Sequence, residues 1–519
     1  MNEKFFNNRF LILYLSPFIL GSLTVFSFQP FNIAIINFII LPFFFYLIIF
    51  INKKSKSIYR KKPYKKNLFI FGTLFGFGYF LSGLHWITNS LTFDESFKIL
   101  IPFSLILLPL FLSLFFGLFT ILVGPFLKNN LPSILLFSFG LAISDFIRAK
   151  IFTGFPWNLW VYSLSSFEEI IQIVNIVGLF AFNLIAITIF VLPVTLIFNI
   201  KFINKVLYLA TIFFLILSLF IFGNFSINKN NEILNNSTKK YLIKVISPNF
   251  KLEYNLSKKF IGERIDKLVR YSEPKANLKT LFVWPEGVFS GYSYKDLKIF
   301  KEKFKNNFNE NHYILFGINR FHSENNGFYN SLVIINNNFE IINEYNKQKL
   351  VPFGEFLPFE SILTKFGLKK ITEGYGSFLK GTKQDNLKLE ELNILPLICY
   401  EIIFTKFIQD ASKSTNIIIN ISEDGWFGNS IGPHQHFAKA IMRAVEQNSY
   451  LIRSANKGIS AIINNKGEVL KKLKPSETGI IELEVPLINS KNKNKNDLIF
   501  FTLLFTYIFI FRFYKNKNV

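Results

Sequence analysis

The sequence has little sulfur, little histidine and few acidic residues. Its 519 residues include one cysteine, Cys399, and five histidines. A single cysteine excludes an internal disulfide and a metal cluster held by several cysteines. Only 34 Asp and Glu stand against 58 Lys and Arg, so the formal net charge is +24. The lysines are scattered among asparagines, and no stretch has the mixed basic and aromatic pattern of a nucleic-acid module. We therefore predict no nucleic-acid partner and attribute the charge to a membrane surface and to compositional bias.

Hydrophobic residues make up half of the chain and are unevenly distributed along it. Runs long enough to cross a bilayer, which takes about 20 residues, recur through residues 1–226. We predict a membrane domain over this range with about seven transmembrane helices, and a last, shorter transmembrane helix at 498–511. The seven predicted spans are residues 10–28, 33–51, 68–87, 99–126, 131–147, 171–199 and 206–225.

Positive charge in the short loops predicts the orientation of these spans. Residues 53–66 hold eight Lys or Arg and residues 201–205 hold two more, on the same side as Lys4 and Arg9. The loop 89–98 has two acidic residues and falls on the opposite side. This pattern puts the N-terminus in the cytoplasm and the region after the seventh span outside. The lysines at 491, 493 and 495 would then face outward, against the rule.

Residues 240–488 have a different texture, in which short β-rich runs alternate with turns rich in Asn, Gly and Lys. Helical stretches at 257–270 and 436–446 lie between some of these runs. Strands that alternate with helices favour an α/β domain with a β-sandwich core. The predicted strands are residues 241–246, 280–284, 313–318, 331–335, 392–398, 416–421, 450–454 and 460–463.

Three segments of this region carry ionisable residues at strand ends or in turns. Glu286 follows a strand and a proline, Lys347 and Glu355 stand on either side of a Pro-Phe-Gly turn, and Cys399 ends the apolar run 392–398. A thiol must lose its proton before it attacks an acyl group, and a carboxylate can accept that proton. A lysine ammonium favours the thiolate and stabilises an anionic tetrahedral intermediate. The set therefore indicates acyl chemistry at a cysteine nucleophile.

The strings around these residues extend the pattern. They are Trp284-Pro-Glu286, Leu350-Val-Pro-Phe-Gly-Glu355, Ile398-Cys-Tyr-Glu401 and Trp426-Phe-Gly-Asn-Ser-Ile-Gly-Pro433. With them the region resembles the carbon–nitrogen hydrolase (nitrilase) superfamily, which has Glu, Lys and Cys in this order on an αββα sandwich. The whole chain resembles the bacterial apolipoprotein N-acyltransferase family more closely, because Gly83-Leu-His-Trp86 and Thr153-Gly-Phe-Pro-Trp157 fit it too. The resemblance implies a multi-span α-helical membrane bundle plus an α/β nitrilase-like domain.

The resemblance also implies roles for the matching residues. Glu286 would be the general base, Lys347 the oxyanion stabiliser and Cys399 the nucleophile. The family has a tryptophan after its first soluble strand that this chain lacks, and a nearby tyrosine is the candidate to replace it. The expected substrate-binding residues are Glu355, Tyr400, Glu401 and Tyr254.

The implied reaction is a two-step acyl transfer through a Cys399 thioester, without a metal or cofactor. The donor would be a phospholipid, foremost phosphatidylethanolamine, and the acceptor the N-terminal amine of a diacylglyceryl-cysteine lipoprotein. We expect a monomer in the bacterial inner membrane with its catalytic domain on the outer, periplasmic side. Apolar residues beside Glu355 are candidates for a lid that keeps water from the thioester. They are Phe353, Phe356, Leu357, Pro358 and Phe359.

Three alternatives remain open at this point. A membrane-tethered amidase or nitrilase would use the same three residues but would have no use for a lipid-facing bundle. A metal hydrolase would use His434 and His436, whose spacing suits a zinc site. A transporter or scaffold would need neither the three residues nor a metal site. The spans argue against a transporter, because they show few internal charges and no evident inverted repeat.

Overall fold

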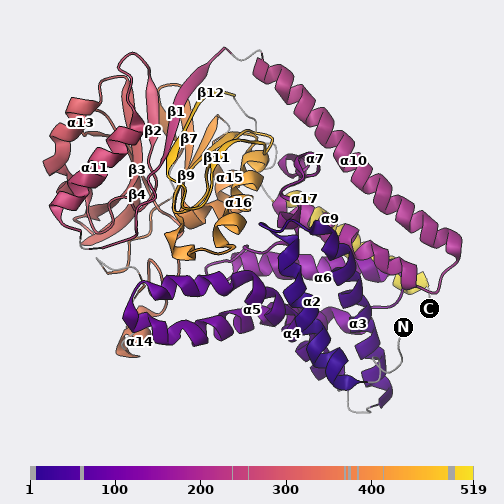
Figure 1. The fold of residues 1–519 in the computed structure, drawn as a ribbon. Coiled ribbons are helices and arrows are strands. Elements are labelled where there is room, and N and C mark those ends of the chain that lie inside the picture. The colour runs from indigo at the N-terminus through magenta and orange to yellow at the C-terminus, as the bar shows by residue number, and fades with distance from the viewer. Residues whose placement is uncertain are drawn as a thin grey trace. The chain divides into compact units, whose positions relative to one another are not determined.

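The computed structural model describes residues 8–58, 64–235, 238–254, 256–366, 370–371, 376–382, 385–412, 414–488 and 497–517. The chain divides into two compact units, Met1–Phe225 with Asn496–Val519, and Ser226–Lys495 (Figure 1). Lys4, residues 59–63 of the basic segment and the lysines at 491, 493 and 495 lie outside the described residues. The part of the predicted orientation that depends on them is therefore not described by the structure.

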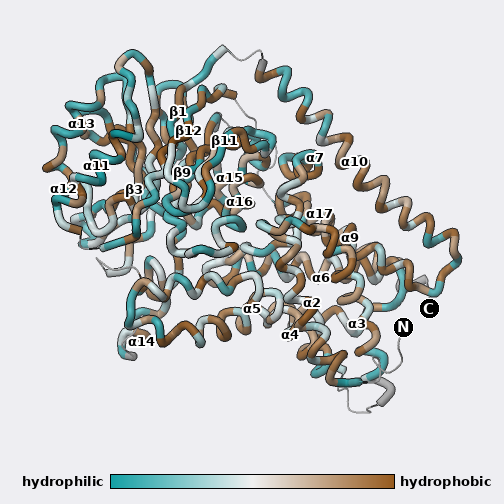
Figure 2. The backbone as a smooth tube through the Cα atoms, viewed as in Figure 1, coloured by the Kyte–Doolittle hydropathy of each residue, from teal (hydrophilic) through white to brown (hydrophobic). Residues whose placement is uncertain are grey.

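Among the described residues, six helices are long and apolar enough to cross a membrane. Figure 2 shows apolar residues along these helices and more polar ones on the outer helices of the second unit. Two shorter apolar helical stretches, Leu11–Ser27 and Leu498–Tyr514, correspond to the first and last predicted spans. The six long stretches are Ala34–Ser55, Tyr64–Thr92, Glu95–Phe126, Leu131–Lys150, Leu179–Ile197 and Phe202–Leu234.

The predicted span 171–199 begins later in the structure. Its helix, α9 (Leu179–Val191), follows Gly178, whose φ of +81° lies outside the helical region. The residues just before it form two single-turn helices, α7 (Glu168–Ile171) and α8 (Val174–Val177). The next helix, α10 (Phe202–Asn235), is longer than the predicted 206–225.

Glycines allow the helices of the first unit to pack closely. Helix α4 (Tyr64–Leu84) lies against α2 (Ser16–Leu23) and α5 (Ile101–Val123). A Cβ atom on Gly21 would lie 2.0 Å from the carbonyl oxygen of Phe75, and one on Gly72 would lie 2.1 Å from Thr120 Oγ1. Larger residues at these positions would force the backbones apart, as is common where helices pack in membranes.

A buried ion pair lies among the described residues of this unit, near the end of α6 (Leu131–Lys150). Arg148 Nη2 lies 2.9 Å from Asp145 Oδ1, and both side chains are almost fully buried. Asn183 on α9 donates to the other Asp145 oxygen at 3.0 Å, and Arg148 also donates to the carbonyl of Phe155. The pair therefore joins α6 to α9 and to the turn after α6.

The second unit contains two six-stranded sheets, with orders β12-β1-β2-β3-β4-β5 and β11-β10-β9-β8-β7-β6. Strands β1, β2 and β3 are parallel in the first sheet, as are β7, β8 and β9 in the second. The Ser454 hydroxyl of β9 donates to the carbonyl of Ile246 in β1 at 3.0 Å, so the two sheets face one another. The strands are β1 (Lys240–Ser247), β2 (Thr280–Val283), β3 (His312–His322), β4 (Gly327–Ile335), β5 (Ile341–Asn346), β6 (Leu387–Leu389), β7 (Leu392–Ile398), β8 (Ile417–Glu423), β9 (Tyr450–Asn456), β10 (Ser460–Ile463), β11 (Val469–Leu473) and β12 (Gly479–Pro486).

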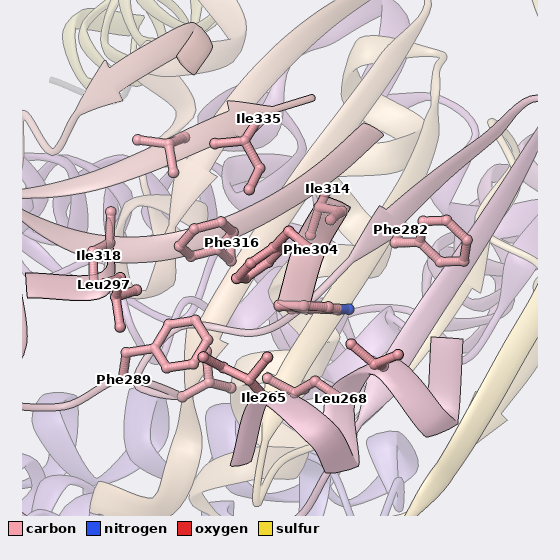
Figure 3. Close-up of a cluster of buried hydrophobic side chains, with 14 of the residues drawn as sticks. Ile265, Leu268, Phe282, Phe289, Leu297, Phe304, Ile314, Phe316, Ile318 and Ile335 are labelled. Atoms are coloured by element: carbon pink, nitrogen blue, oxygen red, sulfur yellow. The ribbon is translucent and has the colours of Figure 1, made fainter. Parts of the chain in front are cut away.

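Helices cover the outer face of each sheet. Helices α11 (Lys258–Ser272) and α13 (Lys301–Asn307) lie on the first sheet, and α15 (Thr405–Asp410) and α16 (Gly432–Gln447) lie beside the second (Figure 1). Figure 3 shows Ile265 and Leu268 of α11 packed with Phe282, Phe304 and Phe316. Each such side chain contributes about 1.5–3 kcal/mol when fully buried. The layers make an αββα sandwich, and the predicted nitrilase-like fold is confirmed.

The sequence prediction missed four strands, β5, β6, β11 and β12, and these are the outer strands of the two sheets. Outer strands have one unpaired edge and are often polar or short. β6 has three residues, and the centre of β11 is exposed. Such strands lack the apolar runs by which the eight inner strands are recognised.

Candidate active site

Three of the predicted residues stand at the ends of strands. Glu286 follows β2 by way of Trp284 and Pro285, Lys347 follows β5, and Cys399 follows β7. β2 and β7 each lie among the parallel strands of their own sheet. The carboxyl ends of parallel strands are where α/β domains place their ligands.

Cys399 occupies a strained turn. Its φ is +49°, in the left-handed region that non-glycine residues enter at a cost of about 1–3 kcal/mol. It begins a single 3₁₀ turn, Cys399–Ile403, directly after the apolar strand β7. The residue is buried, with 9% of its surface exposed.

Glu401 holds this turn in place. Its Oε1 accepts hydrogen bonds from the Tyr345 hydroxyl at 3.0 Å and from the main-chain N–H groups of Gln348 and Lys349 at 2.7 and 3.1 Å. Its Oε2 accepts from the N–H of Ile398 at 2.9 Å. The fully buried carboxylate therefore ties the cysteine turn to the loop after β5. Burial raises its pKa to about 7, although the main-chain donors and Lys347 oppose this.

Lys347 is in contact with two carboxylates. Its Nζ lies 2.9 Å from Glu355 Oε1 and 3.8 Å from Glu286 Oε1, and 1% of its side chain is exposed. Burial lowers the pKa of Lys347, but Glu355 and Glu286 outweigh burial and hold that pKa above its usual value. The ammonium is therefore charged at neutral pH, as an oxyanion stabiliser requires.

Asn330 joins the same two carboxylates. Its Nδ2 donates to Glu286 Oε1 at 2.8 Å and to Glu355 Oε1 at 2.7 Å. Glu355 Oε2 accepts a further bond from the N–H of Val351 at 2.8 Å. Glu286 Oε2 accepts from the N–H of Glu423 at 3.0 Å. Glu286 is thus fixed from both sheets, since Asn330 is in β4 and Glu423 is in β8.

The electrostatics of the cluster keep the thiol protonated. Burial raises the pKa of Cys399, and the Glu286 carboxylate raises it further, while Lys347 and a hydrogen bond with Ser422 lower it. Burial also raises the pKa of Glu286, while Lys347 lowers it. A protonated thiol beside a carboxylate of raised pKa is suited to general-base activation at the moment of attack.

Tyr400 directly follows Cys399, whereas Tyr254 lies in a loop that is connected to the cluster through other residues. The Tyr400 ring packs edge-on against Phe404 with centroids 5.1 Å apart. Tyr254 is half-buried in the loop between β1 and α11. That loop is held at Phe250, which exchanges two hydrogen bonds with the Asn456 side chain. Asn456 also donates to Glu423 Oε2 at 2.7 Å, so the loop is connected to the residue whose N–H holds Glu286.

The segment after β5 leaves the sheet and returns to it. Gly381 donates to the Lys347 carbonyl at 2.8 Å, and Phe378 donates to the Glu355 carbonyl at 2.9 Å. A Cβ atom on Gly381 would lie 2.1 Å from the carbonyl oxygen of Asn346, so only glycine fits this closure. The predicted lid residues divide, because Leu357 is buried whereas Phe353 and Phe359 are 49% and 76% exposed.

His436 is engaged in a buried ionic network. Its Nδ1 lies 3.1 Å from Asp424 Oδ1 and 3.0 Å from Arg453 Nη2. Within the described ranges, no group of three or more His, Cys, Asp and Glu side chains is placed to hold a metal ion. His436 is therefore buried and bound to Asp424, which follows β8, and to Arg453 of β9.

Sequence reasoning missed several residues of the cluster. Ser422, Glu423 and Asp424 follow an apolar run just as Cys399 does, so their strand-end position was a usable signal. Asn330 lies within β4, where nothing in the sequence distinguishes it from other asparagines. Tyr345 lies near Lys347 in the sequence but is given no role by sequence reasoning, because it belongs to the missed strand β5.

Comparison with known proteins identifies two family models in the chain. Residues 20–192 match the apolipoprotein N-acyltransferase N-terminal domain, and residues 264–491 match carbon-nitrogen hydrolase. The apolipoprotein N-acyltransferase of Brucella suis is 31% identical over 487 residues, which cover 91% of this chain and 89% of that protein. That of Rickettsia prowazekii is 32% identical over 424 residues, covering 80% of this chain and 83% of that protein. The chain belongs to the apolipoprotein N-acyltransferase family.

Proposed function

We propose that this protein transfers a fatty acyl chain from a phospholipid to the N-terminal amine of a diacylglyceryl-cysteine lipoprotein. The observation that carries the proposal is the cluster of Cys399, Lys347 and Glu286 in a chain that also matches the family's membrane domain. In this proposal Glu286 is the general base, Lys347 the oxyanion stabiliser and Cys399 the nucleophile.

In the first step, Glu286 accepts the thiol proton as Cys399 Sγ attacks the ester carbonyl carbon of the phospholipid. The C=O electrons move to the oxygen, and Lys347 stabilises the resulting anion. The anion collapses, the C–O bond breaks, and the proton on Glu286 passes to the leaving alcohol oxygen. The products are a thioester on Cys399 and a lysophospholipid, for which phosphatidylethanolamine is the proposed donor.

In the second step, the free amine of the acceptor attacks the thioester carbonyl. Glu286 takes a proton from the amine, the C–S bond breaks and the proton returns to the sulfur. An amide forms, and the enzyme regains its starting state. Glu355 serves this step by positioning Lys347, which it contacts at 2.9 Å.

The other predicted residues, Tyr400, Tyr254, Glu401 and the lid residues, are given the following roles in this cycle. Tyr400 and Tyr254 are proposed to contact substrate. Glu401 was expected to contact substrate as well, and its four hydrogen bonds favour an anchoring role instead. Exposed Phe353 and Phe359 are proposed to cover the thioester from water.

We further propose that residues 1–226 and 498–511 hold a monomer in the bacterial inner membrane, with the catalytic domain, residues 240–488, on its outer side. The long apolar helices support membrane insertion. The charge of the short loops supports the orientation. Holding the catalytic domain at the bilayer suits a reaction whose two substrates are both lipid-anchored.

The test is intact-mass measurement of the purified chain after incubation with phosphatidylethanolamine, beside Cys399→Ala. We expect the mass to rise by one fatty acyl group, the adduct to be released by hydroxylamine and the alanine variant to stay unmodified. Addition of a diacylated lipopeptide should then discharge the adduct and yield triacylated peptide. A chain that forms no adduct with any phospholipid yet releases ammonia from small amides would instead be a membrane-tethered amidase.

A further inference from the structure

Strands β7 and β8 are parallel and place Ile398 opposite Ile421. Cys399 follows Ile398 at the end of β7, and Ser422 follows Ile421 inside β8, where it pairs with Ala455 of β9, so the two residues are neighbours on adjacent strands. Ser422 is fully buried, and its hydroxyl lowers the pKa of the neighbouring Cys399 thiol. The reactive sulfur thus has a hydroxyl neighbour that the two-step cycle described above does not use.

The same hydroxyl is also bound to a carboxylate. Ser422 Oγ donates to Asp424 Oδ1 at 2.6 Å. Arg453 Nη2 donates to both Asp424 oxygens, at 3.1 and 2.8 Å, and His436 Nδ1 lies 3.1 Å from Oδ1. Burial raises the pKa of Asp424, but Arg453 and His436 outweigh it and hold that pKa well below its usual value. Asp424 is therefore a fixed anion inside the domain.

A hydroxyl has one proton and cannot donate it to Asp424 and to the sulfur at once. While Cys399 is a thiol, the anion attracts that proton and leaves a lone pair toward the sulfur. Once the sulfur is charged, it competes for the proton. Asp424 can release it, because Arg453 still satisfies both of its oxygens.

We propose that Ser422 is a positioning residue for Cys399, whose hydroxyl turns from Asp424 to the sulfur whenever the sulfur carries negative charge. The proposal rests on the role of Cys399 as nucleophile. The thiol proton still passes to Glu286, and Ser422 keeps its own proton throughout. This rotation of the hydroxyl would stabilise the sulfur anion twice in each cycle, first before attack on the phospholipid and again as the thioester breaks.

Charged groups on several elements face the same sulfur. Glu286 after β2 and Asp424 after β8 oppose the thiolate, and Lys347 after β5 favours it. Removing the Ser422 hydroxyl and removing the Asp424 charge should therefore act on the thiolate in opposite directions. A purely structural network would respond to both changes in the same way.

The experiment measures the rate at which iodoacetamide labels the full-length chain in detergent at fixed pH. Because Cys399 is the only cysteine, all of the label reports on this thiol. The rate follows the thiolate fraction. Ser422→Ala should label more slowly than the parent, by about threefold to tenfold if one hydrogen bond to the anion is lost. Asp424→Asn should label faster.

A matched control comes from the neighbouring strand. Ser454 lies opposite Ile421 on β9, is equally buried and donates to the Ile246 carbonyl. Ser454→Ala should label at the parent's rate, and Ser422→Thr, which keeps a hydroxyl, should label close to it. Thermal unfolding of each variant identifies any that fail to fold. If Asp424→Asn fails, the comparison of Ser422→Ala, Ser422→Thr and Ser454→Ala still decides.

Equal rates for Ser422→Ala and the parent, or shifts of both variants in one direction, would overturn the proposal. The labelling needs no phospholipid, so it stays readable if the chain forms no acyl adduct. Conversely, an acyl adduct with an unchanged labelling rate in Ser422→Ala would preserve the proposed function and remove Ser422 from it.

Discussion

At the scale of single residues, burial and the charges of the cluster together favour the protonated, unreactive form of the Cys399 thiol. Lys347 is charged, Cys399 is protonated, and Glu286 is held by donors from two sheets. Attack on a substrate requires one proton transfer across groups already in place. A buried thiol of raised pKa is a weak nucleophile until its proton is removed.

The pH dependence of acylation should report Glu286. A general base must be unprotonated, and burial raises the pKa of Glu286 above 4.5. Acyl-enzyme formation should therefore fall on acidification at a higher pH than an ordinary glutamate would give. The Asn330 hydrogen bond lowers the pKa of Glu286, so Asn330→Ala should move this acidic limb to still higher pH.

Single-turnover acylation measured across pH checks this expectation. A limb that stays in place in Asn330→Ala, or that moves to lower pH, would contradict the assignment of Glu286 as the base. The active fraction of each preparation is the proportion of the chain that is finally acylated, as measured by intact mass.

Loss of the Lys347 ammonium should slow acylation strongly. Removing one oxyanion donor costs about 10²–10³ in rate, and Lys347→Met also leaves Glu286 and Glu355 without their shared cation. Lys388→Met, on the exposed face of β6, is the matched control and should acylate normally. Equal single-turnover rates for the two variants would exclude Lys347 from the chemistry.

At the scale of elements, the sequence predicted what lies inside the sheets better than what lies at their edges. Strands β7 and β10 have the predicted bounds because both are buried apolar runs. The polar edge strand β5 was missed, although it delivers Lys347, which was recognised only by its motif. The role of Asn330 could not be predicted from the sequence, because folding brings its partners Glu286 and Glu355 to it.

Glu401 joins the Cys399 turn to the loop after β5, and its protonation should therefore affect the stability of the domain. Its folded-state pKa of about 7 lies above the usual 4.5, so the folded protein favours the protonated form. The stability that this difference contributes is complete below about pH 4.5 and is lost as the pH rises to about 7. Glu401→Gln cannot titrate and should lack this loss.

Thermal unfolding of parent and variant between pH 4.5 and pH 8 checks the sign. The difference in Tm should move in favour of Glu401→Gln as the pH rises. A difference that does not change would show that Glu401 titrates at its ordinary pKa in the folded protein, and one that moves the other way would show that folding lowers this pKa.

At the scale of the whole molecule, stability within the helical unit depends on one buried ion pair as well as on apolar packing. Breaking a buried pair by removing one partner costs about 3–5 kcal/mol, because the other charge is left alone. Asp145→Leu and Arg148→Met should each lower the Tm of the purified chain clearly. The double variant Asp145→Leu with Arg148→Met should unfold closer to the parent than either single variant does.

Additive losses in the double variant would contradict this account, since they would mean that the two side chains act independently. The exposed pair Lys98 and Glu95, 2.6 Å apart on the same unit, serves as the comparison. Its disruption should change the Tm little, because exposed pairs contribute at most about 1 kcal/mol.

The return of the chain at Gly381 to the carbonyl of Lys347 has a consequence for how the family can diversify. Main-chain bonds close the segment at its base, because Gly381 donates to the Lys347 carbonyl and Phe378 donates to the Glu355 carbonyl. Exposed Phe359 lies within the closed segment, so we expect its replacement to leave the ammonium, its carboxylates and the sulfur in place. On the proposed function, substitution at Phe359 is therefore a direct way to alter which lipids the enzyme accepts without rebuilding its chemistry.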